Sequence, residues 1–272
     1  MATLEDLKRI ISRHKSAVIA FSGGVDSTFL ARVCADMLGR EHVLLVTATS
    51  STYPFTELEE SKALAATLGL RQRVITSEET AIPGFAANPP DRCYYCKSEL
   101  FRLIKHIAEQ EGFSAVFDGS NADDTRDYRP GRRALKELGI ESPLCDAGMT
   151  KEEIRALSRQ LGLPTADKPS YACLASRFPY GEQITREKLD RVGKAEEGIR
   201  RLGLGQLRVR SHGDLARIEL DPARIDDGWK MRAQLERICR DSGFTFVAID
   251  TRGYRTGAMN EALSAKGADV SR

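Results

Sequence analysis

The hexapeptide Ser22-Gly23-Gly24-Val25-Asp26-Ser27 follows a short apolar run at 17–21 and precedes a helical pattern at 27–38. Two adjacent glycines allow a tight backbone turn that brings bare N–H groups against an anion. The N-terminus of the helix adds partial positive charge. Asp26 would repel a phosphate unless it holds Mg²⁺ that bridges to the phosphate oxygens. The alternative is a simple glycine turn with an aspartate cap.

We therefore predict a phosphate-binding loop in which Asp26 holds Mg²⁺ and acts in catalysis. The remaining phosphate contacts are assigned to Ser22, Gly23, Gly24 and Ser27. The chain has no Gly-x-x-x-x-Gly-Lys-Ser/Thr sequence, which excludes the P-loop kinases and GTPases. Because ligands of α/β sheets bind beyond the carboxyl ends of the strands, this loop is in the expected place for a nucleotide.

Short apolar runs alternate with helical patterns on both sides of this loop. The predicted strands are 17–21, 43–48, 72–76 and 115–118, and the predicted helices are 27–38, 56–68, 97–111 and 150–161. Such alternation indicates a mostly parallel sheet covered by helices on both faces. We expect an α/β domain over 1–166.

The pattern changes after residue 166. Residues 167–183 have no regular period and contain Pro169, Cys173 and Pro179, so they predict a functional loop between domains. A small α+β domain is predicted over 184–272. Its expected elements are a helix at 185–202, a hairpin of 206–211 with 215–220, a helix at 228–242 and a strand at 244–250.

The bulk composition is that of an ordinary globular protein. Of 272 residues, 41% are hydrophobic and 29% are charged, and the net charge is +2. That charge is too small to indicate nucleic acid. No apolar run approaches the roughly 20 residues of a membrane span, and no signal-peptide pattern opens the chain. We expect a cytoplasmic protein without a membrane or nucleic-acid partner.

Six cysteines in such a compartment are not expected to form structural disulfides. Cys93 and Cys96 form a Cys-x-x-Cys pair, and Cys173 lies in the predicted loop. These three fit a zinc site that lacks a fourth ligand, a redox dithiol, or a three-thiolate iron–sulfur cluster with one open iron. Spacing alone does not choose among these. The other three, Cys34, Cys145 and Cys239, are expected to be packed and inert, although Cys145 could lie near the site.

Several segments together resemble the LarE family of PP-loop ATP pyrophosphatases. They are the hexapeptide, 118–124 (Asp-Gly-Ser-Asn-Ala-Asp-Asp), 127–131 (Asp-Tyr-Arg-Pro-Gly), 173–181, 208–210, 216–220 and 253–260. The resemblance covers nearly the whole chain. Many enzymes share the PP-loop, whereas the motif that starts at Cys173 is specific to LarE-like proteins.

The resemblance implies the adenine nucleotide alpha hydrolase-like fold and an ATP-dependent sulfurtransferase. ATP would adenylate a carboxylate of pyridinium-3,5-biscarboxylic acid mononucleotide, with release of pyrophosphate. Sulfur would then displace AMP and leave a thiocarboxylate of the nickel-pincer nucleotide cofactor of lactate racemase. The same resemblance implies that Asp118 and Arg129 contact ATP.

Two subgroups of the family obtain sulfur differently. In one, a single cysteine matching Cys173 gives up its own sulfur and becomes dehydroalanine. The present chain adds Cys93 and Cys96 and resembles the three-cysteine subgroup, in which a [4Fe-4S] cluster carries an additional sulfide. Sulfide or another sulfur donor is then a partner, and the chain is expected to form a homo-oligomer. Sacrificial donation from Cys173 remains the alternative.

The implied substrate carries two carboxylates and a phosphate, so it needs cations. Arg208 and Arg210 alternate along a predicted strand and could grip phosphate as a fork, unless they are a solvated basic face. Further candidates are Arg177, Arg217 and Arg255. Glu196 and Asp227 match acidic positions that bind a metal in the sacrificial relatives, or are surface residues.

A tRNA-thiolating PP-loop enzyme is the competing function. It would need a basic RNA-binding surface or an added zinc finger. The charge of +2 and the lack of further Cys-x-x-Cys pairs argue against it.

Overall fold

The computed structural model describes residues 3–50, 55–82, 84–125, 130–169, 173–255 and 257–258. The chain divides into two compact units, and each is described by itself. The first unit consists of Met1–Phe85 and Asp91–Tyr171, and the second of Ala86–Pro90 and Ala172–Arg272. In the described residues, no helix has both the length and the apolar character needed to cross a membrane.

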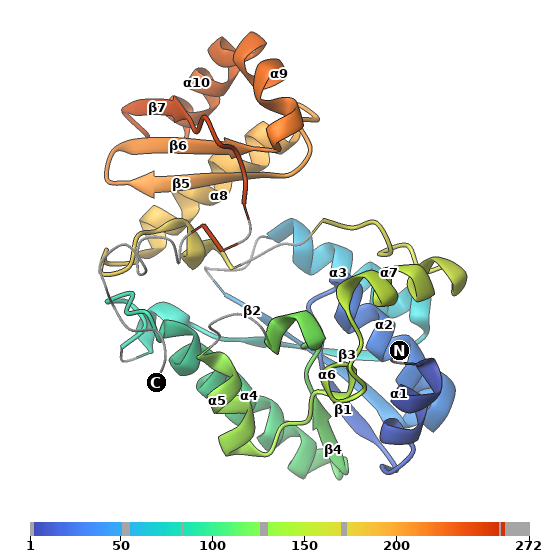
Figure 1. Cartoon of the computed structure of the whole chain (residues 1–272). Helices are drawn as coiled ribbons and strands as arrows, with labels where there is room; N and C mark the ends of the chain where they lie inside the picture. The colour runs from blue at the N-terminus through green and yellow to red at the C-terminus, as the bar shows by residue number, and fades with distance from the viewer. Residues whose placement is uncertain are drawn as a thin grey trace. The chain divides into compact units, whose positions relative to one another are not determined.

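The first unit is built on a four-stranded parallel sheet in the order β3-β2-β1-β4 (Figure 1). Its strands are β1 (Ala17–Ala20), β2 (Val43–Thr49), β3 (Arg71–Thr76) and β4 (Ala115–Phe117). Ala17 at the start of β1 aligns with Val43 of β2 and with Ala115 of β4. The predicted parallel sheet is therefore confirmed, and the carboxyl ends of these strands share one edge.

Helices cover both faces of this sheet. They are α1 (Leu4–Ile11), α2 (Val25–Leu38), α3 (Phe55–Leu68), α4 (Arg92–Glu111), α5 (Gly131–Leu138), α6 (Pro143–Asp146) and α7 (Lys151–Gln160). Ile19 of β1 packs in a core with residues of α1, α2, α6 and α7. Val18, its neighbour, points to the opposite face and packs with residues of α4 and α5. Alternate residues of one strand thus join two cores, because a strand presents successive side chains to opposite faces.

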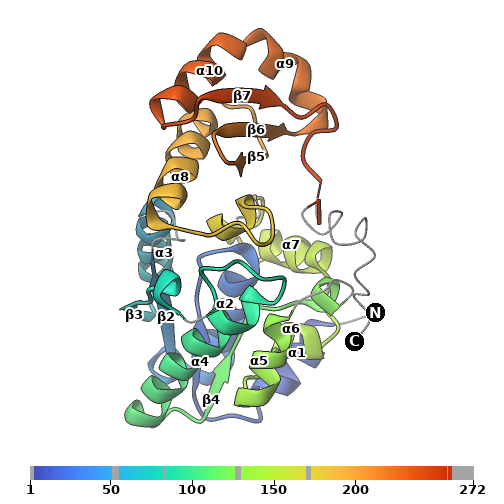
Figure 2. The same ribbon diagram turned by 90° about the vertical axis from the view of Figure 1, so that its left-hand side faces the viewer.

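The second unit contains a three-stranded sheet in the order β5-β6-β7. β5 (Leu207–His212) and β6 (Leu215–Leu220) form the predicted hairpin, and β7 (Phe246–Ile249) lies parallel to β6 (Figure 2). α8 (Arg186–Arg200) packs on β5, and α10 (Arg232–Asp241) packs on β7. The expected small α+β fold is confirmed.

α1, α5 and α6 were not predicted, and two predicted helices differ in their bounds by more than two residues. α4 begins at Arg92 instead of 97, so the Cys-x-x-Cys pair is helical. The helix expected at 228–242 is divided at Met231 into α9 (Ile225–Lys230) and α10.

Candidate active site

The hexapeptide joins β1 to α2 at the carboxyl edge of the first sheet. Gly23 has φ +67°, and a Cβ there would lie 3.1 Å from Cβ of Ser61. Ser22 Oγ lies 3.2 Å from Ser27 Oγ, and the Gly24 N–H donates to Ser22 Oγ over 3.3 Å. Only glycine combines this backbone conformation with so close a neighbour.

Three polar side chains hold the strand end that leads into this loop. The Thr47 hydroxyl of β2 donates to the Phe21 carbonyl over 2.6 Å. The Gln72 amide of β3 donates to Thr47 Oγ1 over 2.8 Å and to Ser61 Oγ over 3.1 Å. The loop is therefore fixed by β2, β3 and α3 as well as by its own hydrogen bonds.

Asp26 occupies the first turn of α2. One carboxylate oxygen, Oδ2, forms an ion pair with the Lys151 ammonium at the start of α7. The other, Oδ1, is buried and makes no hydrogen bond with the described residues. Burial raises the pKa of Asp26, although the Lys151 ammonium and the nearby Asn121 side chain act in the opposite direction. A buried carboxylate oxygen without a hydrogen bond, beside the predicted phosphate-binding loop, fits a Mg²⁺ ligand.

Two lysines near this loop were not predicted. Besides Lys151, Lys168 donates to the Gly23 carbonyl over 3.1 Å and pairs with Glu60 at 2.7 Å. Their sequence signals were weak, because Lys151 is only the second residue of the helix predicted at 150–161 and Lys168 only precedes Pro169. Both add positive charge where phosphates would bind.

Asp118 directly follows β4 and is almost fully buried. Its carboxylate accepts hydrogen bonds from the hydroxyls of Ser142 (2.5 Å) and Ser120 (2.7 Å) and pairs with Lys97 at 3.2 Å. Burial raises the pKa of Asp118, but the Lys97 ammonium and these hydrogen bonds more than offset it, so the pKa is lowered. The predicted contact of Asp118 with ATP stays a prediction.

Cys93 and Cys96 lie in the first turns of α4, immediately before Lys97. The Cys93 side chain is exposed and Cys96 is half-buried. A Cβ at Gly131, the first residue of α5, would lie 2.7 Å from Cδ of Lys97 and 3.3 Å from the Cys93 carbonyl. The close start of α5 thus fixes the turn that carries the cysteine pair.

In the second unit, Cys173 is exposed and begins a short 3₁₀ turn. Arg177 at the end of that turn donates to the Cys173 carbonyl over 3.2 Å and makes two bonds to Glu196 of α8, at 2.7 and 2.8 Å. Glu196 also accepts from the Val209 N–H at 2.9 Å. Burial raises the pKa of Glu196, but Arg177 and this N–H outweigh it and lower the pKa.

The predicted arginine pair lies on one face of the hairpin. Arg210 makes two bonds to Glu219 and donates to the Ser176 carbonyl over 2.7 Å. The Arg208 guanidinium lies 5.0 Å from the ring centre of Tyr254. Burial, with the nearby charge of Arg177, lowers the pKa of Arg208. Both arginines are buried, so they do not form a solvated basic face.

Of the remaining predicted ligands, Arg217 and Arg255 share the carboxylate of Asp250, whereas Asp227 pairs elsewhere. Arg217 bridges Glu219 and Asp250, and Arg255 donates to the Gly253 carbonyl over 2.9 Å. Asp227 is half-exposed and pairs with Lys230 on its own helix and with Arg224 just before that helix. Arg129 lies outside the described residues.

Cys93 and Cys96 belong to one unit and Cys173 to the other, so their convergence stays a prediction. Within the described parts of the chain, no three or more His, Cys, Asp or Glu side chains gather into a metal site. Cys34 and Cys239 are buried as expected, and Cys145 is half-buried beside Arg132.

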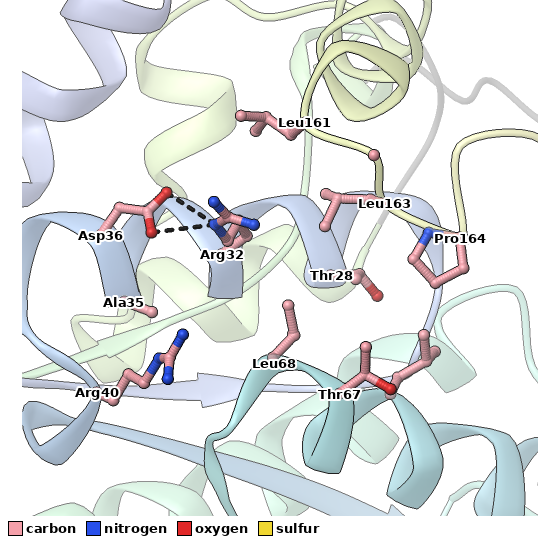
Figure 3. Close-up of a pocket in the computed structure, with 12 residues that line it drawn as sticks. Thr28, Arg32, Ala35, Asp36, Arg40, Thr67, Leu68, Leu161, Leu163 and Pro164 are labelled. Carbon is pink, nitrogen blue, oxygen red and sulfur yellow. Dashed lines mark hydrogen bonds and ion pairs between the residues drawn. The ribbon is translucent and has the colours of Figure 1, made fainter.

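A separate cavity lies against α2, between the end of α3 and residues 161–164 (Figure 3). Thr28, the Arg32–Asp36 ion pair and Leu163 are among its lining residues. Its volume of about 110 Å³ is well below the roughly 300 Å³ of a small ligand pocket. It is too small to hold a nucleotide.

The sequence is similar to those of several known proteins. A family model described as NAD synthase matches residues 5–83, which include the hexapeptide loop. Pyridinium-3,5-bisthiocarboxylic acid mononucleotide synthase of Lactiplantibacillus plantarum is 37% identical over 97% of this chain and 93% of its own length. An uncharacterized protein of Synechocystis sp. is 45% identical over 96% of this chain and 98% of its own length. An uncharacterized protein of Methanocaldococcus jannaschii is 30% identical over 90% of this chain and 92% of its own length.

Proposed function

Because this chain belongs to the LarE family of PP-loop enzymes, we propose that it is the ATP-dependent sulfurtransferase that acts on pyridinium-3,5-biscarboxylic acid mononucleotide. The observation that carries the proposal is the end-to-end similarity to the synthase of Lactiplantibacillus plantarum. The loop geometry supports it, since the Gly23 turn and Asp26 lie at the sheet edge where α/β enzymes bind nucleotides.

The first step is adenylation. A substrate carboxylate oxygen attacks the α-phosphorus of ATP, the α–β phosphoanhydride bond breaks, and pyrophosphate leaves with the electron pair. A carboxylate is a poor electrophile, because its oxygen is a poor leaving group. The mixed anhydride with AMP is a better electrophile, because AMP is a good leaving group. The N–H groups of the Gly23–Gly24 turn, Lys168 and Lys151 are placed to stabilise charge on the phosphates.

Mg²⁺ fits the orphaned Oδ1 of Asp26, an oxygen ligand of the kind that this ion prefers. When bound, the ion neutralises charge on the leaving pyrophosphate. Replacing Asp26 by Ala should therefore abolish adenylation while leaving the fold intact.

The second step is sulfur transfer. Sulfur attacks the acyl carbon, the carbon–oxygen bond to AMP breaks, and a thiocarboxylate remains. The exposed side chains of Cys93 and Cys173, together with Cys96, fit an iron–sulfur cluster, because thiolates are its usual protein ligands. Bound by these three thiolates, a [4Fe-4S] cluster would supply an iron without a protein ligand, at which inorganic sulfide can bind.

The arginines of the second unit are the proposed substrate contacts. Arg177, Arg208, Arg210 and Arg255 lie in or beside a buried face in which guanidinium groups outnumber the nearby carboxylates Glu196, Glu219 and Asp250. Such a face favours an anionic ligand. Because Glu196 forms a buried ion pair with Arg177, we assign Glu196 to positioning that arginine and not to binding a metal.

The test of the reaction is an assay with the pure protein, the mononucleotide and labelled ATP. Formation of AMP and pyrophosphate only when substrate is present, with a thiocarboxylate product by mass spectrometry, is the expected result. Release of ADP as the main product would contradict the proposal. Asp36→Ala, a surface carboxylate of the same helix, is the matched control for Asp26→Ala.

The sulfur source needs a second experiment. The anaerobically reconstituted protein receives excess sulfide, ATP and substrate and is then analysed by intact-protein mass spectrometry. Several products per chain at unchanged protein mass support the cluster. A loss of about 34 Da at Cys173, the mass of H₂S, with one product per chain would establish sacrificial donation instead. Cys145→Ala should retain iron, whereas Cys93→Ala, Cys96→Ala and Cys173→Ala should lose it.

A further inference from the structure

Lys151 and Asp26 form an ion pair between elements 125 residues apart in sequence. Lys151 is the first residue of α7, and hydrogen bonds hold its backbone in place. Thr150 and Glu153 form a capping box at the start of that helix. The Lys151 N–H also donates to Asp123 Oδ2 over 2.8 Å. The backbone at Lys151 is thus fixed, while the ammonium lies at the end of a flexible four-carbon stem.

The ion pair occupies the carboxylate that the reaction needs for Mg²⁺. A divalent ion on Asp26 and an ammonium at hydrogen-bond distance from the same carboxylate repel each other. Either Mg²⁺ binds Asp26 weakly, or the Lys151 ammonium moves away from Asp26 when the ion binds. The buried Oδ1 makes no hydrogen bond with the described residues, although the nearby Asn121 side chain favours the charged carboxylate, so the Lys151 ammonium engages only Oδ2.

A polyphosphate changes this balance. Its oxygens offer the ammonium a new set of anionic partners at the same loop, because Asp26 lies within the turn that would cradle the phosphates. The neighbouring Lys168 contacts the Gly23 carbonyl and Glu60, and Lys97 pairs with Asp118. Of these three lysines only Lys151 pairs with Asp26, so its move to a phosphate would be the one that releases the Asp26 carboxylate.

We propose that Lys151 is an ionic latch that holds Asp26 until nucleotide arrives and then transfers to the phosphate oxygens, which releases Asp26 to Mg²⁺. This inference rests on the nucleotide-binding part of the proposed function. Its consequence is a coupling between two ligands: Mg²⁺ alone binds poorly, and the nucleotide raises its affinity. Such coupling is reciprocal, so Mg²⁺ raises the affinity for nucleotide by the same factor.

The coupling can be measured without catalysis. Calorimetry on the purified chain gives the Kd of Mg²⁺ alone, and the Kd of Mg²⁺ in the presence of an ATP analogue with a methylene bridge between its α and β phosphorus atoms. For the unaltered chain we expect the analogue to tighten Mg²⁺ binding by about fivefold or more.

Lys151→Gln removes the latch. In this variant Mg²⁺ alone should bind more tightly than in the unaltered chain, the analogue should bind more weakly, and the coupling factor should fall toward one. Lys151→Arg keeps the charge and should retain most of the coupling. Lys62→Gln removes an exposed lysine that pairs with Glu59 on α3, and it should behave like the unaltered chain.

A merely structural ion pair gives a different pattern. If Lys151→Gln lowers the unfolding temperature while the affinity for Mg²⁺ alone does not rise and the coupling is unchanged, the latch is wrong. The AMP- and pyrophosphate-forming assay is run on the unaltered chain in parallel. If that assay yields no AMP and pyrophosphate but nucleotide still tightens Mg²⁺ binding, the proposed reaction is wrong and the role of Lys151 as a latch is retained.

Discussion

The guanidinium of Arg177 and the carboxylate of Glu196 face each other through two hydrogen bonds of 2.7 and 2.8 Å, and their side chains are only 1% and 3% exposed. The same guanidinium binds the Cys173 carbonyl over 3.2 Å. The turn that carries Cys173 is thus attached to α8 by a buried ion pair.

Glu196→Ala should strongly destabilise the protein, because it leaves the Arg177 charge buried without its carboxylate. Removal of one partner of a buried pair costs about 3–5 kcal/mol. Urea unfolding measures the loss. Glu197→Ala is the control, since Glu197 is the next residue and pairs with Arg200 and Arg201 at the surface. Equal losses in the two variants would contradict the assigned role of Glu196.

Asp118 should make stability depend on acid pH. Its pKa in the folded chain is lowered, since the Lys97 ammonium and two serine hydroxyls outweigh burial. The carboxylate therefore stabilises the fold above its unfolded pKa of about 3.9, and this contribution is lost as pH falls from there through the lower folded pKa.

Urea unfolding of the unaltered chain and of Asp118→Asn, from pH 7 to pH 2.5, tests this prediction. The variant should be less stable at pH 7, and the difference should shrink below about pH 4. Asp36→Asn, which removes a surface partner of Arg32, should show little difference at any pH. A gap between the unaltered chain and Asp118→Asn that stays constant over this range would show that Asp118 is not the titrating group.

Gly23→Ala should abolish nucleotide binding for a steric reason. The new Cβ would lie 3.1 Å from the Ser61 Cβ and 3.2 Å from its Cα, at φ +67°. Gly139 has the same φ, +67°, and a Cβ added there would have nothing within 4 Å. Both alanine variants should lose about 1–2 kcal/mol of unfolding free energy from the left-handed conformation. Only Gly23→Ala should lose affinity for the ATP analogue, measured by calorimetry.

The cysteines should separate into two reactivity groups in the metal-free, reduced protein. Cys93 and Cys173 are exposed and should react first with iodoacetamide. Burial raises the pKa of Cys239 to about 12 and raises that of Cys34 further, so few thiolates form there. Peptide mass spectrometry gives the order of labelling. Early alkylation of Cys34 or Cys239 without denaturant would contradict their assignment to the core.

The parallel sheet was predictable because its two central strands, β1 and β2, are mostly buried. Residues 17–21 and 43–48 read as largely apolar runs for this reason. The start of α4 was not predictable in the same way. Tyr94 in its first turn donates to Glu137 over 2.7 Å and lies under the Arg133 guanidinium, which is 3.9 Å from the ring centre. These contacts come from α5, so the local pattern did not reveal the helical start.

The candidate site was predictable where one short segment determines it. The Gly23 turn needs only its own glycines and the flanking strand and helix. Lys151 was missed because its partner, Asp26, is distant in sequence and meets it only in the folded sheet. The alternation of Arg208 and Arg210 indicated their common face. The pairing of Arg210 with Glu219 depends on the hairpin register, which places Glu219 opposite Arg208, two positions from Arg210.

The segment 86–90 belongs to the second unit although the chain on either side of it belongs to the first. Asn88, at φ 52°, donates from its side chain to the carbonyls of Phe178 and Pro179, over 3.3 and 2.7 Å. The carbonyls of Asn88 and Ala86 accept from the N–H groups of Gly181 and Ile184. A gene fragment starting at codon 172 therefore encodes an incomplete unit. To express the second unit alone, a designer must graft residues 86–90 back, as an added peptide or a circularly permuted insert.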